Sequence, residues 1–556
     1  MRREVSVVNK KVCSFPILFA LLTLLIGTCA VVFPASAQAA PTSTGSITVS
    51  GTVARSYDAY QIFSANVVDG DSDAKIATDL AWASDAVRDA ALPVLHSAGM
   101  PNSQTNAQEA AEWLNTDSHL TSALSAQLAR SLQSSGAEPV ALNAGTAAEL
   151  HCGYWLIVAD DDAIAQGEAG TAPIMALVGG SAVTVKPKAA TPKVAKHVLE
   201  DSTAAWQKAA DATVADDLYW RLSATVPAGL AAYDTYAVQF VDTMSAGLDP
   251  SKVAASMHVY VAAGADGGFD AVACEGGNAN STPAKGWTDI TSQCKVSIEG
   301  NAFTVRTGDL IAALGGTEAF TAGARVVAVY NAPLNSACNH GIAKGNPNEV
   351  YLRYPRSPLA DQSGDAGFTR TPSDDACAYT WGLSLIKRSS SDDKPLAGAN
   401  LSIIDDRGRI LTTDGSWSTD ADACITTDAD GHVELSGVDA GVYTVEEIAA
   451  PKGYTAFEGK RTVTVTAEGL DVKQVATAKP KVTVSVENPL RIDTADARTG
   501  SIELSVLNTP SKEAGRGFMP STGDRTLVLV AVLAAIGVAA IVVALVIKRG
   551  GGRREK

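Results

Sequence analysis

Two short segments place residues that can do chemistry at fixed spacing. Val183-Thr-Val-Lys-Pro-Lys188 ends an alternating strand pattern with a proline, so Lys188 is expected to present its amine on a rigid strand end. An amine held in this way can attack an activated carbonyl. The second segment, Tyr443-Thr-Val-Glu-Glu447-Ile-Ala-Ala-Pro451-Lys-Gly453-Tyr454, carries a glutamate in an apolar strand pattern, where burial favours the protonated acid. The residue types thus offer an exposed amine at a strand end and a buried acid.

The N-terminal residues 1–37 are predicted to be a secretory signal. Basic residues precede an apolar stretch from Phe15 to Phe33, and Ala35-Ser36-Ala37 is a small-residue cleavage site. The alternative is an N-terminal membrane anchor.

The C-terminus combines three features in order. Met519-Pro520-Ser521-Thr522-Gly523 precedes an apolar run, Thr526 to Ile547, that is long enough to span a bilayer as a transmembrane helix, and basic residues follow. This arrangement resembles the cell-wall sorting signal of Gram-positive surface proteins, LPxTG, with Met519 in place of leucine. The resemblance implies that a sortase cleaves after Thr522 and joins its carboxyl to another amine. A plain membrane anchor is the alternative.

The segment ending at Lys188 resembles the pilin motif VxVYPK of Gram-positive major pilins, with Lys186 where tyrosine is usual. The resemblance implies that Lys188 receives the Thr522 carboxyl of the next subunit. Lys186 and Lys193 are the alternative nucleophiles. A solvated lysine at a strand end is the structural alternative.

The segment from Tyr443 to Tyr454 resembles the pilin E-box, YxLxExxAPxGY, and the surrounding stretch from Leu396 resembles a CNA-B domain. In such domains the glutamate promotes attack of a lysine on an asparagine side chain. The implied residues are Glu447, Lys387 on the first strand, Asn508 on the last strand, and Asn488 as the alternative asparagine.

The region 189–373 resembles a fimbrial isopeptide-forming domain, through Pro192-Lys-Val-Ala-Lys196, Phe240-Val-Asp242 and Gly345-Asn-Pro-Asn348. The resemblance implies that Asp242 promotes a bond between Lys196 and Asn348, with Asn346 as the alternative. The residues after the closing strand, Pro355-Arg-Ser-Pro358, depart from the family's asparagine-rich pattern.

The implied reaction follows from burial. A buried lysine loses its proton and becomes a nucleophile, while a buried acid keeps its proton and can polarise the asparagine carboxamide. Ammonia leaves and an amide crosslink remains, once per domain, so the chain is expected to process itself and not to be a turnover enzyme. The alternative in each domain is a simple buried ion pair. The first domain offers only Arg55 near its opening strand, and no crosslink is expected there.

Composition excludes other functions. The formal net charge of −16 argues against nucleic acid as a partner. The sequence lacks CxxC, HExxH, GxSxG and glycine-rich phosphate loops, so no metal and no cofactor are expected. Asp428-Ala-Asp430-Gly431 is interpreted as a β-turn and not as half of a calcium loop. An exported chain permits disulfides: proximity favours Cys274 with Cys294, while Cys377 has either Cys338 or Cys424 as its partner.

Strand-like alternation recurs along the chain, and residues 76–135 show helical spacing. We therefore predict a mainly β protein of tandem Ig-like (CNA-type) β-sandwich domains, the first with a helical insert. The predicted divisions are the signal 1–37, an N-terminal pilin domain 38–188, an isopeptide-forming domain 189–373, a CNA-B domain 374–512, and a tether with the sorting signal, transmembrane helix and basic tail 513–556.

The resemblance implies a shaft subunit of a covalent, cell-wall-anchored pilus on a Gram-positive bacterium, supporting adhesion. The implied partners are pilin-class and housekeeping sortases, identical subunits, minor pilins, peptidoglycan and host surfaces or matrix. The alternative is a monomeric wall-anchored adhesin, or a minor pilin at the tip or base.

Overall fold

The computed structural model describes residues 43–51, 54–70, 74–116, 118–187, 190–264, 283–413 and 415–511. The chain separates into two compact units. The first runs to Thr380 and includes Gly437–Asp439 and Ala467–Lys481, and the second holds the rest of the chain from Trp381 onward. The sheets fall into three sets, which we call the N-terminal, middle and C-terminal domains. The prediction of a mainly β fold is confirmed.

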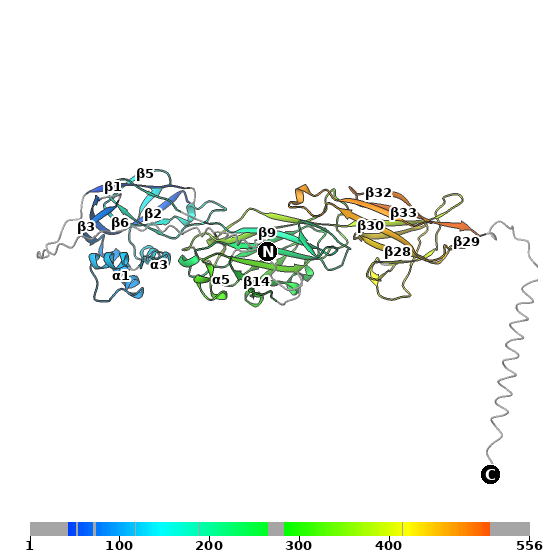
Figure 1. Cartoon of the computed structure of the whole chain (residues 1–556), viewed down its shortest axis with the longest axis horizontal. Coiled ribbons are helices and arrows are strands. Elements are labelled where there is room, and N and C mark those ends of the chain that lie inside the picture. The colour runs from blue at the N-terminus through cyan, green and yellow to red at the C-terminus, as the bar shows by residue number, and fades with distance from the viewer. Residues whose placement is uncertain are drawn as a thin grey trace, which may run out of the picture. The chain divides into compact units, whose positions relative to one another are not determined.

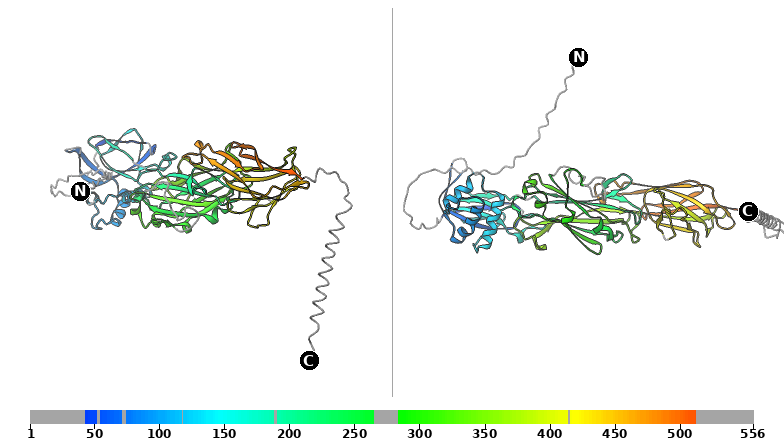
Figure 2. Two further views of the ribbon diagram at one scale, coloured as in Figure 1. Left: turned by 45° about the vertical axis from the view of Figure 1, so that its right-hand side comes forward. Right: turned by 90° about the horizontal axis from the view of Figure 1, so that it is seen from below.

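The N-terminal domain has three layers, with helices on one face of a sheet and a second sheet on the other (Figures 1 and 2). One sheet has the order β5-β1-β8, and the other has the order β3-β2-β6-β7 with β4 beside β2. The elements are Thr44–Val49 (β1), Ser56–Asp69 (β2), Lys75–Trp82 (β3), Asp85–Ser97 (α1), Ala107–Asn115 (α2), Ser122–Ser134 (α3), Val140–Asn143 (β4), Ala147–His151 (β5), Gly153–Ala159 (β6), Ile174–Val178 (β7) and Val183–Val185 (β8).

The helical insert is shorter than predicted. Residues 75–82 form β3, which pairs with β2, so the prediction of helix from residue 76 is wrong for this part. The first helix begins only after Ser84, whose side chain caps α1 by accepting from the Val87 amide. Asn106 and Glu109 form a capping box at the start of α2, so local capping sets where these helices begin.

The middle domain consists of two sheets around one apolar core. Their orders are β10-β9-β12-β18-β14-β15 and β11-β21-β19-β13-β17-β16, with β20 beside β19. The elements are Lys193–Glu200 (β9), Ala205–Gln207 (β10), Ala209–Asp211 (β11), Tyr219–Val226 (β12), Gln239–Met244 (β13), Val253–Ser256 (α4), His258–Ala263 (β14), Thr288–Asp289 (β15), Lys295–Glu299 (β16), Ala302–Arg306 (β17), Leu310–Ala313 (α5), Ala324–Asn331 (β18), Asn346–Pro355 (β19), Phe368–Arg370 (β20) and Asp374–Tyr379 (β21).

The C-terminal domain also has two sheets. One has the order β27-β22-β33-β29 with β32 beside β33, and the other has the order β25-β24-β23-β28-β30-β31 with β26 beside β23. The strands are Trp381–Ser389 (β22), Asn400–Ile404 (β23), Ile410–Leu411 (β24), Trp417–Ser418 (β25), Ile425–Thr426 (β26), His432–Val438 (β27), Gly441–Ala449 (β28), Tyr454–Thr455 (β29), Arg461–Glu468 (β30), Lys481–Val486 (β31), Leu490–Asp496 (β32) and Ser501–Pro510 (β33).

The predicted terminal signals lie outside the described residues. These are the secretory signal 1–37, the pentapeptide Met519–Gly523 and the apolar run Thr526–Ile547. Among the residues that the structure describes, no helix is long and apolar enough to cross a membrane.

Candidate functional site

The middle domain buries a lysine, an aspartate and an asparagine together in its core. Lys196 on β9, Asp242 on β13 and Asn348 on β19 each have no exposed surface. Lys196 Nζ donates to the Asp242 carboxylate. Tyr330 on β18 joins the group, because its Oη lies 2.9 Å from both Lys196 Nζ and Asn348 Nδ2 and donates to Asp242 Oδ2 at 3.1 Å.

The strand register places these side chains. Lys196 and Tyr330 belong to one sheet, and Asp242 and Asn348 to the other. Asp242 pairs with Val350 across the antiparallel β13–β19 ladder, so Asn348 is its diagonal neighbour. Diagonal residues share a face of a sheet and lie within reach of each other. The polar side chains of the two sheets therefore face each other and form one small site inside an apolar core.

The two candidate asparagines have different surroundings. Asn346 donates from Nδ2 to the carbonyls of Asn339 and Ala378, and its Oδ1 accepts from the Asn339 amide. These are structural bonds at the start of β19. Asn348 instead contacts Tyr330 within the lysine site. The geometry therefore favours Asn348 over the alternative, Asn346.

Burial sets the charge states of the middle-domain site. It lowers the pKa of Lys196 to about 8, although the nearby Asp242 carboxyl acts in the opposite direction and raises that pKa. Burial also raises the pKa of the Asp242 carboxyl, against the effect of the nearby amine. Asp242 Oδ1 and Asn348 Oδ1 are buried without a hydrogen-bond partner among the described residues. Unpaired buried acceptors are costly, so burial and the unpaired Oδ1 both disfavour the charged form of Asp242.

The C-terminal domain holds a second group of the same composition. Lys387 Nζ on β22 donates to Asn508 Oδ1 on β33 at 2.6 Å and lies 3.0 Å from Glu447 Oε1 on β28. Asn508 Nδ2 in turn donates to Glu447 Oε1 at 2.7 Å. Burial lowers the pKa of Lys387 to about 8.

The surroundings of this second group fix its geometry. Phe457 lies against it, with its backbone amide donating to Glu447 Oε2 at 3.1 Å and its ring centroid 5.2 Å from Lys387 Nζ. The alternative asparagine, Asn488, is exposed, and its carbonyl accepts from Arg461. The structure thus brings Lys387 together with Asn508 and not with Asn488.

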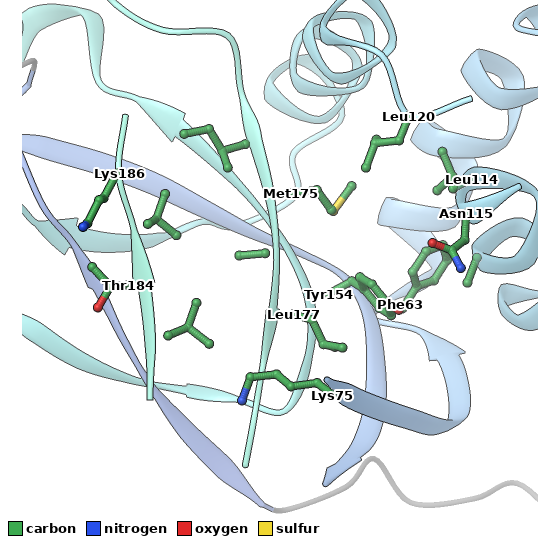
Figure 3. Close-up of a pocket in the computed structure, with 15 residues that line it drawn as sticks. Phe63, Lys75, Leu114, Asn115, Leu120, Tyr154, Met175, Leu177, Thr184 and Lys186 are labelled. Carbon is green, nitrogen blue, oxygen red and sulfur yellow. The ribbon is translucent and has the colours of Figure 1, made fainter. Parts of the chain in front are cut away.

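The N-terminal domain contains a pocket beside the strand that leads to Lys188. Its volume is about 550 Å³, and its walls include Phe63, Tyr154, Leu114 and Met175 (Figure 3). Lys186, which is exposed, lies on its border next to β8. Lys188 and Thr522 lie outside the described residues, while Lys193 is exposed at the start of β9. Arg55 is exposed as well.

The cysteine predictions are partly wrong. Cys152, Cys294, Cys338, Cys377 and Cys424 are free thiols, so Cys377 is paired with neither Cys338 nor Cys424. The Cys377 sulfur and the Tyr379 ring lie beside Gly345. A side chain at position 345 would collide with both, so the glycine leaves space for them. Burial raises its pKa to about 11, which keeps the thiol protonated. Cys294 donates to the Ile290 carbonyl at 3.3 Å, and Cys274 lies outside the described residues.

The acidic turn at Asp428 is confirmed as a turn. Asp428 Oδ1 accepts from the amides of Asp430 and His432, and the chain reverses there between β26 and β27. Within the described ranges no group of His, Cys, Asp and Glu side chains is arranged to hold a metal ion.

Residues 382–480 match the family model for SpaA, a prealbumin-like fold domain. The C-terminal domain is therefore similar to a SpaA-type prealbumin-like domain over these residues. The matched residues include Lys387 and Glu447 of the buried group and end before Asn508. We call this domain the SpaA domain below.

A curated relative gives a second comparison. The trypsin-resistant surface T6 protein of Streptococcus pyogenes serotype M6 is 26% identical over 167 residues. The aligned part is 29% of this chain and 29% of that protein, so the chain matches under a third of the relative's length.

Solved pilin structures are also similar to the chain. The T6 backbone pilin of serotype M6 Streptococcus pyogenes aligns at 16% identity and a TM-score of 0.46, over 84% of this chain and 98% of that chain. The major pilin SpaD from Corynebacterium diphtheriae aligns at 14% identity and a TM-score of 0.42, again over 84% and 98%. BcpA, the major pilin subunit of Bacillus cereus, aligns at 12% identity and a TM-score of 0.37, over 84% and 99%.

Proposed function

We propose that the chain is the shaft subunit of a covalently polymerised pilus on the surface of a Gram-positive bacterium. In this proposal a sortase joins the Thr522 carboxyl of one subunit to the Lys188 amine of the next. The chain acts as a structural protein and a sortase substrate, and its chemistry on itself consists of internal crosslinks. The finished polymer is anchored to the cell wall and supports adhesion.

The observation that carries the proposal is the pair of buried lysine, acid and asparagine groups in two successive domains. A simple buried ion pair needs only a lysine and an acid, and it contributes little to stability. In the SpaA domain the lysine nitrogen contacts the asparagine carboxamide at 2.6 Å, and the acid binds the nitrogen of that carboxamide. These contacts hold the amine, the carboxamide and the acid next to one another, which supports an exchange of one amide nitrogen for another.

The proposed reaction balances without any external reactant. The neutral amine of Lys387 adds to the Asn508 carboxamide carbon, and Glu447 assists the proton transfer. A carbon–nitrogen bond forms to Lys387, the bond to Asn508 Nδ2 breaks, and ammonia leaves. The same scheme in the middle domain uses Lys196, Asn348 and Asp242. Positioning of the reacting groups and exclusion of water supply the rate enhancement.

The pocket in the N-terminal domain supports the site of linkage between subunits. Its apolar walls lie beside β8, the strand that leads into Lys188. Phe518 and Met519 lie four and three residues before Thr522 in the sequence, and they are apolar residues of the kind such walls accept.

We also extend to this chain the trypsin resistance named for its T6 relative.

The linkage is tested by substituting Lys188→Ala in cells that carry the pilin sortase. We expect the ladder of high-mass polymer on denaturing gels to disappear. Lys193→Ala is the matched control, since it removes an exposed lysine at the start of β9 that does not line the pocket, and it should keep the ladder. A ladder that persists in Lys188→Ala refutes this lysine as the acceptor. A wild-type chain found only as wall-linked monomer supports the adhesin alternative.

A further inference from the structure

A tyrosine hydroxyl lies at the centre of the middle-domain site. Tyr330 Oη accepts from Lys196 Nζ and from Asn348 Nδ2, each at 2.9 Å, and donates to Asp242 Oδ2 at 3.1 Å. Its ring is completely buried and packs edge-on against Phe303, with 4.8 Å between centroids. The hydroxyl is therefore fixed between the nitrogen that would attack and the nitrogen that would leave.

In the SpaA domain the acid itself, and no hydroxyl group of the described residues, contacts both the lysine nitrogen and the asparagine nitrogen. There, Glu447 Oε1 lies 3.0 Å from Lys387 Nζ and 2.7 Å from Asn508 Nδ2, so one carboxyl oxygen reaches both. In the middle domain the acid is an aspartate, which is shorter by one methylene. Asp242 Oδ2 contacts Lys196 and Tyr330, and it is Tyr330 that contacts the Asn348 nitrogen. The tyrosine thus occupies the gap that the shorter acid leaves.

We propose that Tyr330 is a catalytic residue of the middle-domain crosslink, relaying a proton from the attacking Lys196 nitrogen toward the departing Asn348 nitrogen. This inference rests on the proposed function. As Lys196 Nζ bonds to the Asn348 carboxamide carbon, Nζ gives one proton to Asp242 Oδ2. Asp242 passes a proton to Tyr330 Oη while Tyr330 gives its own to Nδ2. The bond from the carbon to Nδ2 then breaks and ammonia leaves, with Asp242 and Tyr330 in their starting states.

The path requires two hydrogen bonds of the unreacted site to reverse, because Tyr330 Oη there donates to Asp242 Oδ2 and accepts from Asn348 Nδ2. Once Asp242 Oδ2 has taken the Lys196 proton, it becomes the donor to Tyr330 Oη. In the unreacted site, Asn348 Nδ2 is a planar amide nitrogen and donates to Tyr330 Oη. Once the carboxamide carbon becomes tetrahedral, that nitrogen has a free lone pair and can accept a proton from the same hydroxyl. The atoms that line the site are buried, so solvent is excluded from replacing the hydroxyl.

The test follows ammonia loss by intact mass in the full chain, sampled over time after synthesis. Tyr330→Phe keeps the ring and removes only the hydroxyl. We expect it to lose the SpaA-domain ammonia at the wild-type rate and the middle-domain ammonia about 10²-fold more slowly, the usual size of a general acid–base contribution. Tyr354→Phe is the matched control. It removes a buried hydroxyl on β19 that bonds to the Glu168 carbonyl, and both ammonia losses should stay at the wild-type rate.

The outcomes separate the two proposals. If wild type never loses a second ammonia, the middle-domain crosslink itself is wrong. If wild type loses both and Tyr330→Phe matches its rate, the crosslink stands and the relay is refuted.

If the Tyr330→Phe chain fails to fold, a second measurement tests the relay without removing the hydroxyl. Replacing the tyrosines by 3-fluorotyrosine keeps the hydroxyl and its packing but makes it a stronger acid. A relay predicts a changed rate for the middle-domain bond and an unchanged rate for the SpaA bond. Two unchanged rates would overturn the relay, because a proton transfer through the hydroxyl depends on the acidity of that hydroxyl.

Discussion

Lys387 Nζ lies 2.6 Å from Asn508 Oδ1, and this contact links the first and last strands of the SpaA domain. The two strands, β22 and β33, run parallel and pair directly, from Gly382 with Ser501 to Ser389 with Asn508. Pulling on the two ends of such a domain would shear the hydrogen bonds between these strands. A covalent bond between Lys387 and Asn508 would carry that load instead, which is the property a pilus shaft requires.

Substitutions in the SpaA group should prevent one crosslink and destabilise the domain. We expect Glu447→Ala to be heavier than wild type by one ammonia, after allowing for the substitution. It also leaves Lys387 buried without its acid, which costs about 3–5 kcal/mol in the free energy of unfolding. Intact mass and thermal melting check the two effects. Asn488→Ala, at the exposed alternative asparagine, should retain the crosslink; a mass showing that it does not would reassign the bond.

The middle domain offers a sharper comparison between neighbouring asparagines. Asn348→Ala should abolish the middle-domain ammonia loss, because the acceptor carboxamide is gone. Asn346→Ala should keep it, although three hydrogen bonds to the Asn346 side chain are lost, at about 1 kcal/mol each. Peptide mapping after digestion would locate the crosslinked lysine. The reverse pattern, with the bond lost only in Asn346→Ala, would show that Asn346 is the acceptor.

The resemblance to pilin motifs predicted the residues of both buried groups, and the strand pattern predicted which elements carry them. Lys196, Asp242 and Asn348 were predicted from short motifs and lie together in the core, as do Lys387, Glu447 and Asn508. Each of these residues falls on a strand whose alternation is clear in the sequence. A strand with clear alternation fixes which residues face the core, so the inward direction of these side chains was predictable.

Tyr330 was missed because its role depends on a contact between two sheets. On β18 it alternates with Val326 and Ala328 on the core face, so its burial could have been predicted. A buried tyrosine hydroxyl needs a polar partner, which is a weak signal for a site. Which partner it finds depends on how the two sheets pack, and no local pattern encodes that. The strand β3 was missed for a related reason, since pairing with β2 outweighs its helix-like spacing.

Crosslink formation should depend on pH through the buried lysines. An ordinary lysine has a pKa near 10.5, whereas burial lowers those of Lys196 and Lys387 to about 8. Below that value the amine is protonated and cannot attack, and above it the neutral nucleophile predominates. The rate of ammonia loss in chains synthesised at a series of pH values should therefore rise as the pH passes through about 8. A rate that rises only near the ordinary lysine pKa would contradict this account, and Lys387→Ala provides the baseline for the SpaA bond.

Resistance to trypsin should depend on the two crosslinks together. Trypsin cleaves chains that open locally, and cleavage follows the population of the open form when closing is fast. A bond between the first and last strands of the SpaA domain, and another between β9 and β19 of the middle domain, would restrict such opening. We expect wild-type chain to persist under conditions in which the Asp242→Ala and Glu447→Ala double variant is digested. Each single variant should make only the domain that lacks its crosslink susceptible to trypsin. The masses of the fragments over a time course would show which domain is cleaved. Equal digestion of wild type and the double variant, with the variant shown to be folded at the start, would mean that the fold alone provides the resistance.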